Sequence, residues 1–198
     1  MATPQFLSIG SETGMPLQSI KATGEETSDN VLVQTLDAYG RTLTSYTWND
    51  WAAEDACWVN DDFEPVDGVT IPVGQGLWVQ GLSGDQGIQS AGSVGKSDVV
   101  VALRLGCTAT GNPFPVAIDL QDVVAEGDEA SDNVLIQTLD AYGRTLTSYT
   151  WNDWAAENPC CVNDDFEPVE GVTILSGQGL WVQGLSDFQS IRFPAPEL

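Results

Sequence analysis

The chain contains no histidine, and only six of its 198 residues are lysine or arginine. Because 29 residues are aspartate or glutamate, the formal net charge is −23. Such a surface repels nucleic acid and anionic lipid headgroups, since both are bound through Lys and Arg. The absence of His also removes the usual general base of Ser and Cys triads. Because of the negative net charge, we expect no nucleic-acid partner. A salty or calcium-containing extracellular medium, which screens charge, suits this composition.

Long apolar segments are also absent. No run of 18 apolar residues occurs, which predicts that the chain does not insert into a membrane. The first residues lack the basic and apolar regions of a signal peptide, so we expect no signal peptide in this sequence. No window shows a sustained 3.6-residue apolar period, and only residues 51–54 suggest a single helical turn.

Cysteines are few, namely Cys57, Cys107, Cys160 and Cys161. Cys57 and Cys160 are equivalent positions of an internal repeat, whereas Cys107 and Cys161 have no Cys counterpart. This pattern favours a Cys107–Cys161 bridge, a Cys57–Cys160 bridge between the repeats, and an oxidising compartment. The alternative is four reduced, partly buried thiols. A zinc site is disfavoured because the chain has neither His nor a Cys-x-x-Cys spacing.

The internal repeat is the main positive feature. Asp29–Ser83 returns as Asp132–Ser186 with seven substitutions in 55 residues. The substitutions are Val33/Ile136, Asp55/Asn158, Ala56/Pro159, Trp58/Cys161, Asp67/Glu170, Pro72/Leu175 and Val73/Ser176. Upstream, Gln5–Gly10 matches Val101–Gly106 more faintly, with about six residues missing from the first repeat. We predict a β-rich unit at 1–92, a short linker at 93–97 and a second β-rich unit at 98–198.

Each unit is expected to be built from strands. Residues 30–36 are rich in β-branched side chains, and Asp37–Gly40 fits a type I turn with a glycine bulge before a strand over 41–48. That turn places Leu32 opposite Tyr46 and Val33 opposite Ser45. An irregular acidic loop follows over 49–67, and further strands are predicted at 77–80, 88–90 and 98–105. The fold class is all-β, with two tandem β-sandwich or barrel-like units.

Two short motifs carry a family resemblance. They are Gly-Asn-Pro-Phe-Pro at 111–115, followed by Ile118-Asp119, and Gly-Gln-Gly-Leu-Trp-Val at 177–182. Together they resemble a β-rich module of secreted and surface proteins of Bacteroidetes and Verrucomicrobia-type bacteria. The resemblance covers most of the second unit, whereas the first opens with a different sequence at 14–17. It implies an exported, repetitive, structural or adhesive protein, without a defined activity.

The best candidate site combines aromatic and acidic residues of the loop after the first hairpin and its copy. We select Trp48, Trp51, Asp61, Trp151, Trp154 and Asp164, accompanied by Tyr46, Trp58, Asn60, Asp62, Tyr149, Asn163 and Asp165. Indole faces stack on the C–H faces of sugars, and carboxylates accept hydrogen bonds from hydroxyls. The alternative is that these indoles fill the core. A structural calcium ion is a further alternative, since residues 60–67 offer five oxygen-bearing side chains, although the EF-hand spacing is absent.

Catalysis is not expected. Asp61 and Asp62 are neighbours on a loop, which is not the separated carboxylate pair of a glycoside hydrolase. We predict a non-catalytic extracellular or cell-surface protein of the structural or adhesive type, such as a stalk, filament or surface-layer building block. Its partners would be other copies or neighbouring repeat units. The alternative is a carbohydrate-binding module with a glycan partner. High internal identity also fits an engineered consensus repeat.

Overall fold

The computed structural model describes residues 5–8, 14–37, 39–82, 84–90, 95–140, 143–186 and 188–196. The protein is all-β, as predicted. Apart from strands, the described part contains only two single-turn 3-10 segments, η1 (Leu17–Ser19) and η2 (Leu120–Asp122). No helix in these ranges is long and apolar enough to cross a membrane.

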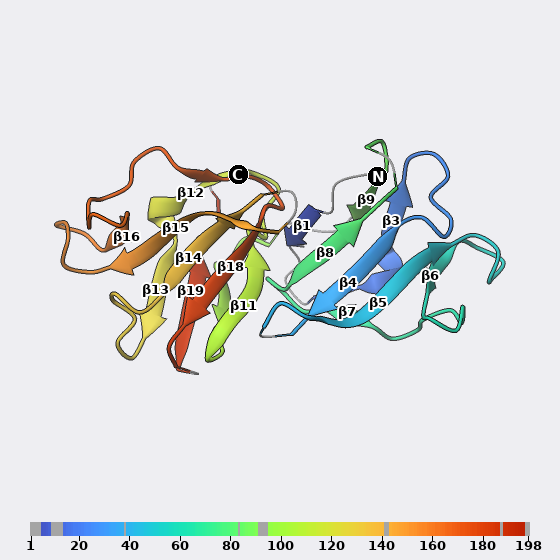
Figure 1. Ribbon diagram of the computed structural model, residues 1–198, viewed down its shortest axis with the longest axis horizontal. Coiled ribbons are helices and arrows are strands. Elements are labelled where there is room, and N and C mark those ends of the chain that lie inside the picture. The colour runs from blue at the N-terminus through green and yellow to red at the C-terminus, as the bar shows by residue number, and fades with distance from the viewer. Residues whose placement is uncertain are drawn as a thin grey trace.

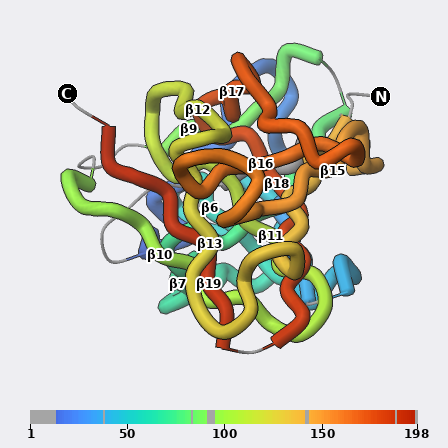
Figure 2. The backbone as a smooth tube through the Cα atoms, turned by 90° about the vertical axis from the view of Figure 1, so that its left-hand side faces the viewer, coloured from blue at the N-terminus to red at the C-terminus, as the bar shows by residue number. Residues whose placement is uncertain are grey.

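The strands form two groups that lie one after the other along the long axis of the molecule (Figure 1). We call residues 5–90 unit one and residues 95–196 unit two. Seen from the unit-two end, β15, β16 and β18 lie in front of the strands of unit one (Figure 2). The exact boundaries stay a prediction, because residues 91–94 of the expected linker lie outside the described residues.

Unit one is a five-stranded sheet covered by two short ladders. The sheet order is β1 (Gln5–Ser8), β8 (Gly76–Gln80), β4 (Leu32–Leu36), β5 (Thr42–Asn49) and β6 (Cys57–Val59). The short ladders are β2 (Met15–Pro16) with β7 (Thr70–Ile71), and β3 (Ile20–Thr23) with β9 (Gly87–Ser90). Sequence reasoning missed β6, which lies inside the segment expected to be an irregular loop.

Unit two repeats this plan and adds one strand. Its five-stranded order is β11 (Gly106–Gly111), β18 (Gly179–Gly184), β14 (Leu135–Leu139), β15 (Thr145–Asn152) and β16 (Cys160–Val162). The smaller sheets are β12 (Ile118–Asp119) with β17 (Thr173–Ile174), and β10 (Val99–Ala102), β19 (Gln189–Phe193) and β13 (Val124–Gly127) in that order. All ladders are antiparallel.

The ladders of unit one recur in unit two 103 positions later, including at the openings. Corresponding register partners are Gln5–Val79 and Thr108–Val182, Met15–Ile71 and Ile118–Ile174, and Ala22–Ile88 and Ala125–Ile191. The expected match of Gln5–Gly10 to Val101–Gly106 is therefore wrong, and the first unit has no missing residues there. That match was built on small and apolar residues, which occur in many strands and so fix no register.

The first hairpin turns where predicted, but its register shifts. Gly40 adopts φ +74°, and its N–H donates to the carbonyl of Asp37 at 3.0 Å. Next to the turn Leu36 faces Thr42, as the predicted register requires. A bulge then shifts the pairing by one residue, so that Val33 faces Tyr46 instead of Ser45. The extra residue sends Val33 and Tyr46 to the same face, which is the buried one.

Each unit has its own hydrophobic core on one face of its five-stranded sheet. In unit one the core contains Val33, Tyr46, Trp48, Trp58, Leu77 and Val79 beneath the short ladders. In unit two the corresponding residues are joined by Phe114, Ile191 and Phe193. Within β8 the core residues Leu77 and Val79 are two positions apart, while Trp78 between them faces the other side of the sheet.

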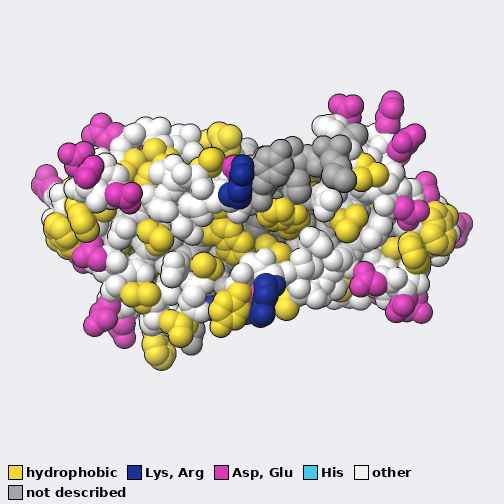
Figure 3. Space-filling view, in the orientation of Figure 1, with side chains coloured by type: hydrophobic (Ala, Val, Ile, Leu, Met, Phe, Trp, Pro, Cys, Tyr) yellow, Lys and Arg dark blue, Asp and Glu magenta, His cyan; other side chains and the backbone are white. Residues whose placement is uncertain are grey.

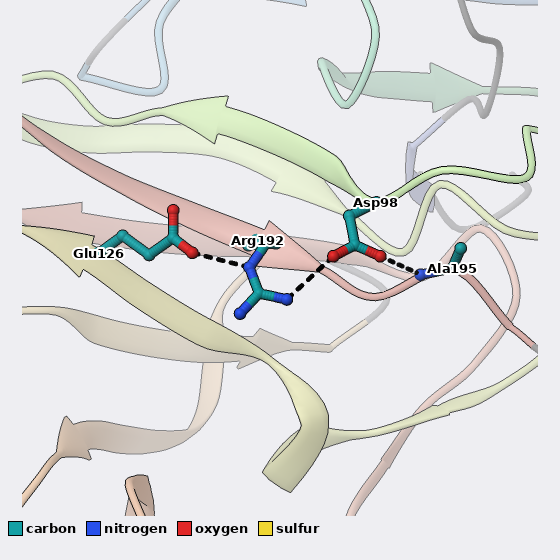
Figure 4. Close-up of polar contacts among 4 residues, drawn as sticks. All are labelled: Asp98, Glu126, Arg192 and Ala195. Atoms are coloured by element: carbon teal, nitrogen blue, oxygen red, sulfur yellow. Dashed lines mark hydrogen bonds and ion pairs between the residues drawn. The ribbon is translucent and has the colours of Figure 1, made fainter.

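The additional strand β10 is clamped by an ion-pair cluster on β19 and β13 (Figure 4). Arg192 donates from Nε to Glu126 at 2.7 Å and from Nη1 to Asp98 at 2.9 Å. Asp98 also accepts the backbone N–H of Ala195 at 2.9 Å. These contacts, the Ala195 N–H first and Arg192 next, hold the pKa of Asp98 below its usual range. The strand β10 lies at the edge of its sheet and pairs with β19 of the same chain.

The two units meet through the faces of their five-stranded sheets that point away from the cores. The contact is reciprocal, because a glycine of each unit packs on a Trp of the other. A Cβ placed on Gly40 would clash with the Trp181 ring, and one on Gly143 would clash with the Trp78 ring. Both glycines adopt a positive φ, so they are required for the turn as well as for the close approach. Around these rings a small cluster forms from Leu36, Trp78, Ala109, Leu139 and Trp181.

A second element of the junction is the turn at Gly74. Its carbonyl accepts a buried hydrogen bond from Thr110 Oγ1 at 2.6 Å, and a Cβ at Gly74 would clash with Val101. The neighbouring substitutions Pro72/Leu175 and Val73/Ser176 lie in this turn and its copy. An apolar groove of about 250 Å³ lies beside it, with Leu43, Val73, Val101 and Cys107 among its lining residues.

Candidate functional site: two aromatic tips

An exposed aromatic pair lies at each end of the long axis. Tip one consists of Asp29, Asn49, Trp51 and Phe63, and tip two of the equivalent Asp132, Asn152, Trp154 and Phe166. Tip one adjoins β5 and β6, whereas tip two adjoins β15 and β16, at the opposite end of the molecule (Figure 1). Trp51 is 60% exposed and Phe63 50%, so neither ring is part of the hydrophobic core.

The indole of tip one is pinned by a carboxylate that sequence reasoning missed. Asp29 adopts φ +61°, and its Oδ2 accepts the N–H of the Trp51 indole at 3.0 Å. The other carboxylate oxygen accepts from Nδ2 of Asn49 at 2.7 Å. Asn49 is fully buried, and its Oδ1 accepts the backbone N–H of Trp51 and Ala52 at 3.0 and 2.7 Å. The ring is therefore held in place although most of its surface faces solvent.

Phe63 completes the pair from a strained backbone position. Its ring centroid lies 5.4 Å from that of Trp51, with an interplanar angle of 31°. The residue adopts φ +60°, a conformation that L-residues with bulky side chains avoid. Asn60 builds the turn that imposes this conformation, because its Oδ1 accepts the backbone N–H of Asp62 and Glu64. A large apolar ring held exposed at a strained position is typical of a functional contact rather than of stabilisation.

Tip two reproduces this arrangement. The Trp154 indole donates to Asp132 at 2.9 Å, and Asn152 again links the carboxylate to the backbone of the loop. The centroids of Trp154 and Phe166 lie 5.8 Å apart at 27°, and Phe166 also adopts φ +60°. None of the seven substitutions between the repeats falls on these eight residues.

The charge around both tips has one sign. Residues 49–67 contain no Lys or Arg, and their acidic side chains, all exposed, are Asp50, Glu54, Asp55, Asp61, Asp62, Glu64 and Asp67. Residues 152–170 also lack basic side chains, and their exposed acidic residues are Asp153, Glu157, Asp164, Asp165, Glu167 and Glu170. Figure 3 shows acidic side chains gathered at both ends beside hydrophobic ones, with basic side chains near the middle.

The structure divides the predicted site residues into two sets. Trp51, Trp154, Asp61 and Asp164 are exposed at the tips. Trp48 and Trp151 are buried in the two cores, at 7% and 6% exposure, and so are removed from the candidate contact surface. Tyr46 and Trp58 also lie in the core of unit one. The core alternative thus holds for the strand positions, and the candidate contact surface is restricted to the loop residues that follow them.

The Trp58/Cys161 substitution is explained by a compensating change in the core. Trp58 packs edge-to-face on Trp48, and its indole N–H donates to the carbonyl of Ile20 at 2.7 Å. Ile20 faces Ser90 on β9. In unit two the position equivalent to Ser90 is Phe193, which is fully buried in the same core as Cys161. Phe193 of β19 thus adds a phenyl ring to the core that lacks the indole, and the buried N–H of Trp151 has no hydrogen-bond partner.

Both expected disulfides are wrong, and all four cysteines are free. Cys57 on β6 and Cys160 on β16 lie at opposite ends of the molecule (Figure 1). Cys107 on β11 and Cys161 on β16 belong to the two edges of one five-stranded sheet, about 19 Å apart at the usual strand spacing. A disulfide needs Cα atoms within about 7 Å. Burial raises the pKa of the Cys161 thiol to about 12, with smaller contributions from Cys160 and Asp119.

The expected calcium ligands are not assembled into a site. Within the described ranges no group of three or more His, Cys, Asp or Glu side chains is arranged to hold a metal ion. Asn60 and Asn163 instead use their side-chain oxygens to cap backbone N–H groups of their turns.

The two motifs that carry the family resemblance lie together in unit two and have a structural role. The Asn112 side chain is fully buried and donates to the carbonyls of Val116, Ile174 and Leu175. Its backbone N–H donates to the carbonyl of Gln178 in the second motif. Asn112 thus ties the end of β11 to the turn before β18.

No protein-family model, curated protein sequence or solved structure matches the chain.

Proposed function

We propose that the chain is a non-catalytic structural or adhesive protein of the cell surface or extracellular space, which bridges two partners through its aromatic tips. The observation that carries this proposal is the presence of two matching exposed Trp–Phe pairs at opposite ends of one molecule. Two contacts that point apart bind separate partners, whereas two contacts on one face would grip a single partner. The acidic surface opposes tip-to-tip contact between copies in low salt.

The alternative function, a carbohydrate-binding module, is favoured by one feature of the same tips. Because the Trp51 and Trp154 indole N–H groups already donate to carboxylates, each ring offers its face rather than its polar edge to a ligand. Such a face suits the C–H surface of a sugar ring. In this alternative the two units make a bivalent lectin-like protein, which is compatible with an adhesive role.

Bead agglutination tests the bridging function. Free protein is mixed with beads coated with neutral, cationic or anionic polysaccharide, or with protein. We expect agglutination of at least one kind of bead. Trp51→Ala or Trp154→Ala alone should abolish agglutination while the protein still binds the beads. Tyr39→Ala, which removes an aromatic ring that is 75% exposed outside the tips, is the matched control. The proposal fails if no beads agglutinate, or if the single-tip variants agglutinate them as well as the wild type.

A further inference from the structure

We propose that each tip binds a chain of amino sugars whose amino groups are free and protonated, such as a glucosamine oligomer. This inference rests on the proposed bridging function, and it names the ligand class that the tips accept. Three properties of the tips lead to it, namely the orientation of the rings, the sign of the surrounding charge and the rigidity of the loop.

The orientation of the rings selects the kind of contact. The indole N–H of Trp51 is occupied by Asp29, and Phe63 has no polar atom in its side chain. A ligand can therefore contact only the apolar faces of the rings. It can do so by stacking its C–H groups on a ring or by placing a cation over the ring face. Donation of the indole N–H to a carboxylate adds electron density to the ring, which strengthens its attraction for positive charge.

The charge selects the ligand. Seven exposed carboxylates and no basic side chain lie within residues 49–67, and six carboxylates and no basic side chain lie within 152–170. An anionic polysaccharide such as a uronic acid chain is repelled, and a neutral sugar gains no Coulombic attraction. An amino sugar satisfies both parts of the tip at once, because its pyranose ring stacks on carbon and its ammonium groups face the carboxylates.

Rigidity favours a sugar over a basic peptide. The tip is held by the hydrogen bond that the backbone N–H of Trp51 donates to the fully buried Asn49, and by the Asx-type turn at Asn60. A stiff pyranose chain loses little freedom on such a preformed surface, whereas a flexible lysine-rich segment must be ordered as it binds. A repeating ligand also explains why the same tip occurs at both ends.

Calorimetric titration with three hexamers tests the inference. Glucosamine hexamer carries rings and charge, N-acetylglucosamine hexamer carries rings without charge, and hexalysine carries charge without rings. At a pH below the pKa of the sugar amine, we expect two glucosamine hexamers per chain, and binding that weakens as salt is raised from 0.1 M to 1 M, where the Debye length falls from about 10 Å to about 3 Å. The two other hexamers should bind at least about tenfold more weakly.

Two variants locate the binding. Trp51→Ala should reduce the stoichiometry from two to one and leave the affinity of the remaining site unchanged. Phe63→Gly, which removes the strained ring while leaving the backbone free to fold, should have the same effect. Tyr39→Ala should keep both sites. Equal binding of the neutral hexamer, or of hexalysine, overturns the inference, as does retention of two sites in the variants. If beads agglutinate but no glucosamine hexamer binds, the inference fails while the bridging function stands.

Discussion

At the scale of single residues, the tip aromatics separate binding from stability. Phe63 and Phe166 both adopt φ +60°, and both are about half exposed. A left-handed conformation costs a non-glycine residue about 1–2 kcal/mol. The contact between the two aromatic rings stabilises the fold by about 0.5–1.5 kcal/mol. Since these magnitudes nearly cancel, phenylalanine adds little to the free energy of unfolding relative to glycine at this position, and its place in the sequence is better explained by contact with a ligand.

This balance gives a prediction for position 63. Phe63→Ala loses the ring and keeps the strain, whereas Phe63→Gly loses the ring and relieves the strain. We expect the glycine variant to be more stable than the alanine variant by about 1 kcal/mol. Urea denaturation of the two purified variants measures the difference. A glycine variant less stable than the alanine variant would show that the backbone at Phe63 is not strained.

Cys161 gives a prediction for alkaline pH. Its folded pKa, about 12, lies above the ordinary value of 9.0 because the thiol is buried. The folded state therefore binds the proton more tightly, and the stability from this group is fully present below pH 9 and is lost as pH rises towards 12. Relative to Cys161→Ala, the wild type should lose stability over this window, by an amount on the order of 4 kcal/mol. Parallel unfolding curves for the two proteins across the window would contradict the assignment.

At the scale of elements, the sequence predicted what depends on local chemistry. The turn at Asp37–Gly40 was found because Asp and Gly at its ends have specific backbone roles. The shift of the hairpin register was not found, because the bulge opposite Thr35 and Leu36 depends on which face of β5 packs on the core. Likewise β6 was missed, since Cys57–Val59 is too short to show a pattern and is stabilised by pairing with β5.

Only part of each tip could be predicted, again because local sequence does not show which residues the fold brings together. Trp51 was selected from its place in an acidic loop, but Trp48, three residues earlier, was selected with it and is buried. Strand alternation continued from Tyr46 would have assigned Trp48 to the core. Asp29, which pins the indole, lies 22 residues away in sequence, and only the folded hairpin brings it close.

The core exchange between units gives a prediction about β9. Trp58→Cys in unit one should lower the free energy of unfolding by about 3–5 kcal/mol, because no phenyl ring fills the vacated volume there. Adding Ser90→Phe should restore at least about 1 kcal/mol, whereas the same change in the wild-type background, where Ser90 is exposed and Trp58 fills the core, should add less stability. A double-mutant cycle by chemical denaturation measures this coupling. Simple additivity of the two changes would refute the proposed compensation.

At the scale of the whole molecule, the junction between the units is small compared with their cores. The reciprocal contacts of Trp78 and Trp181 lie outside both main clusters. We expect Trp78→Ala combined with Trp181→Ala to leave both cores folded but to loosen the junction. Small-angle X-ray scattering should then report a larger radius of gyration, and far-ultraviolet circular dichroism should be unchanged. An unchanged radius would show that the turn at Gly74 is sufficient to hold the units together.

The opposed tips determine how the molecule carries load. A pull applied at both ends passes along each five-stranded sheet and then across the junction, which includes the packing of Trp181 on Gly40, that of Trp78 on Gly143, and the buried hydrogen bond from Thr110 to Gly74. Each sheet is cross-linked by continuous ladders of backbone hydrogen bonds, so the junction is the weaker part. In the proposed bridging role, we expect the units under tension to separate there first and to remain joined by the connecting chain, so that the molecule would lengthen before either sheet unfolds.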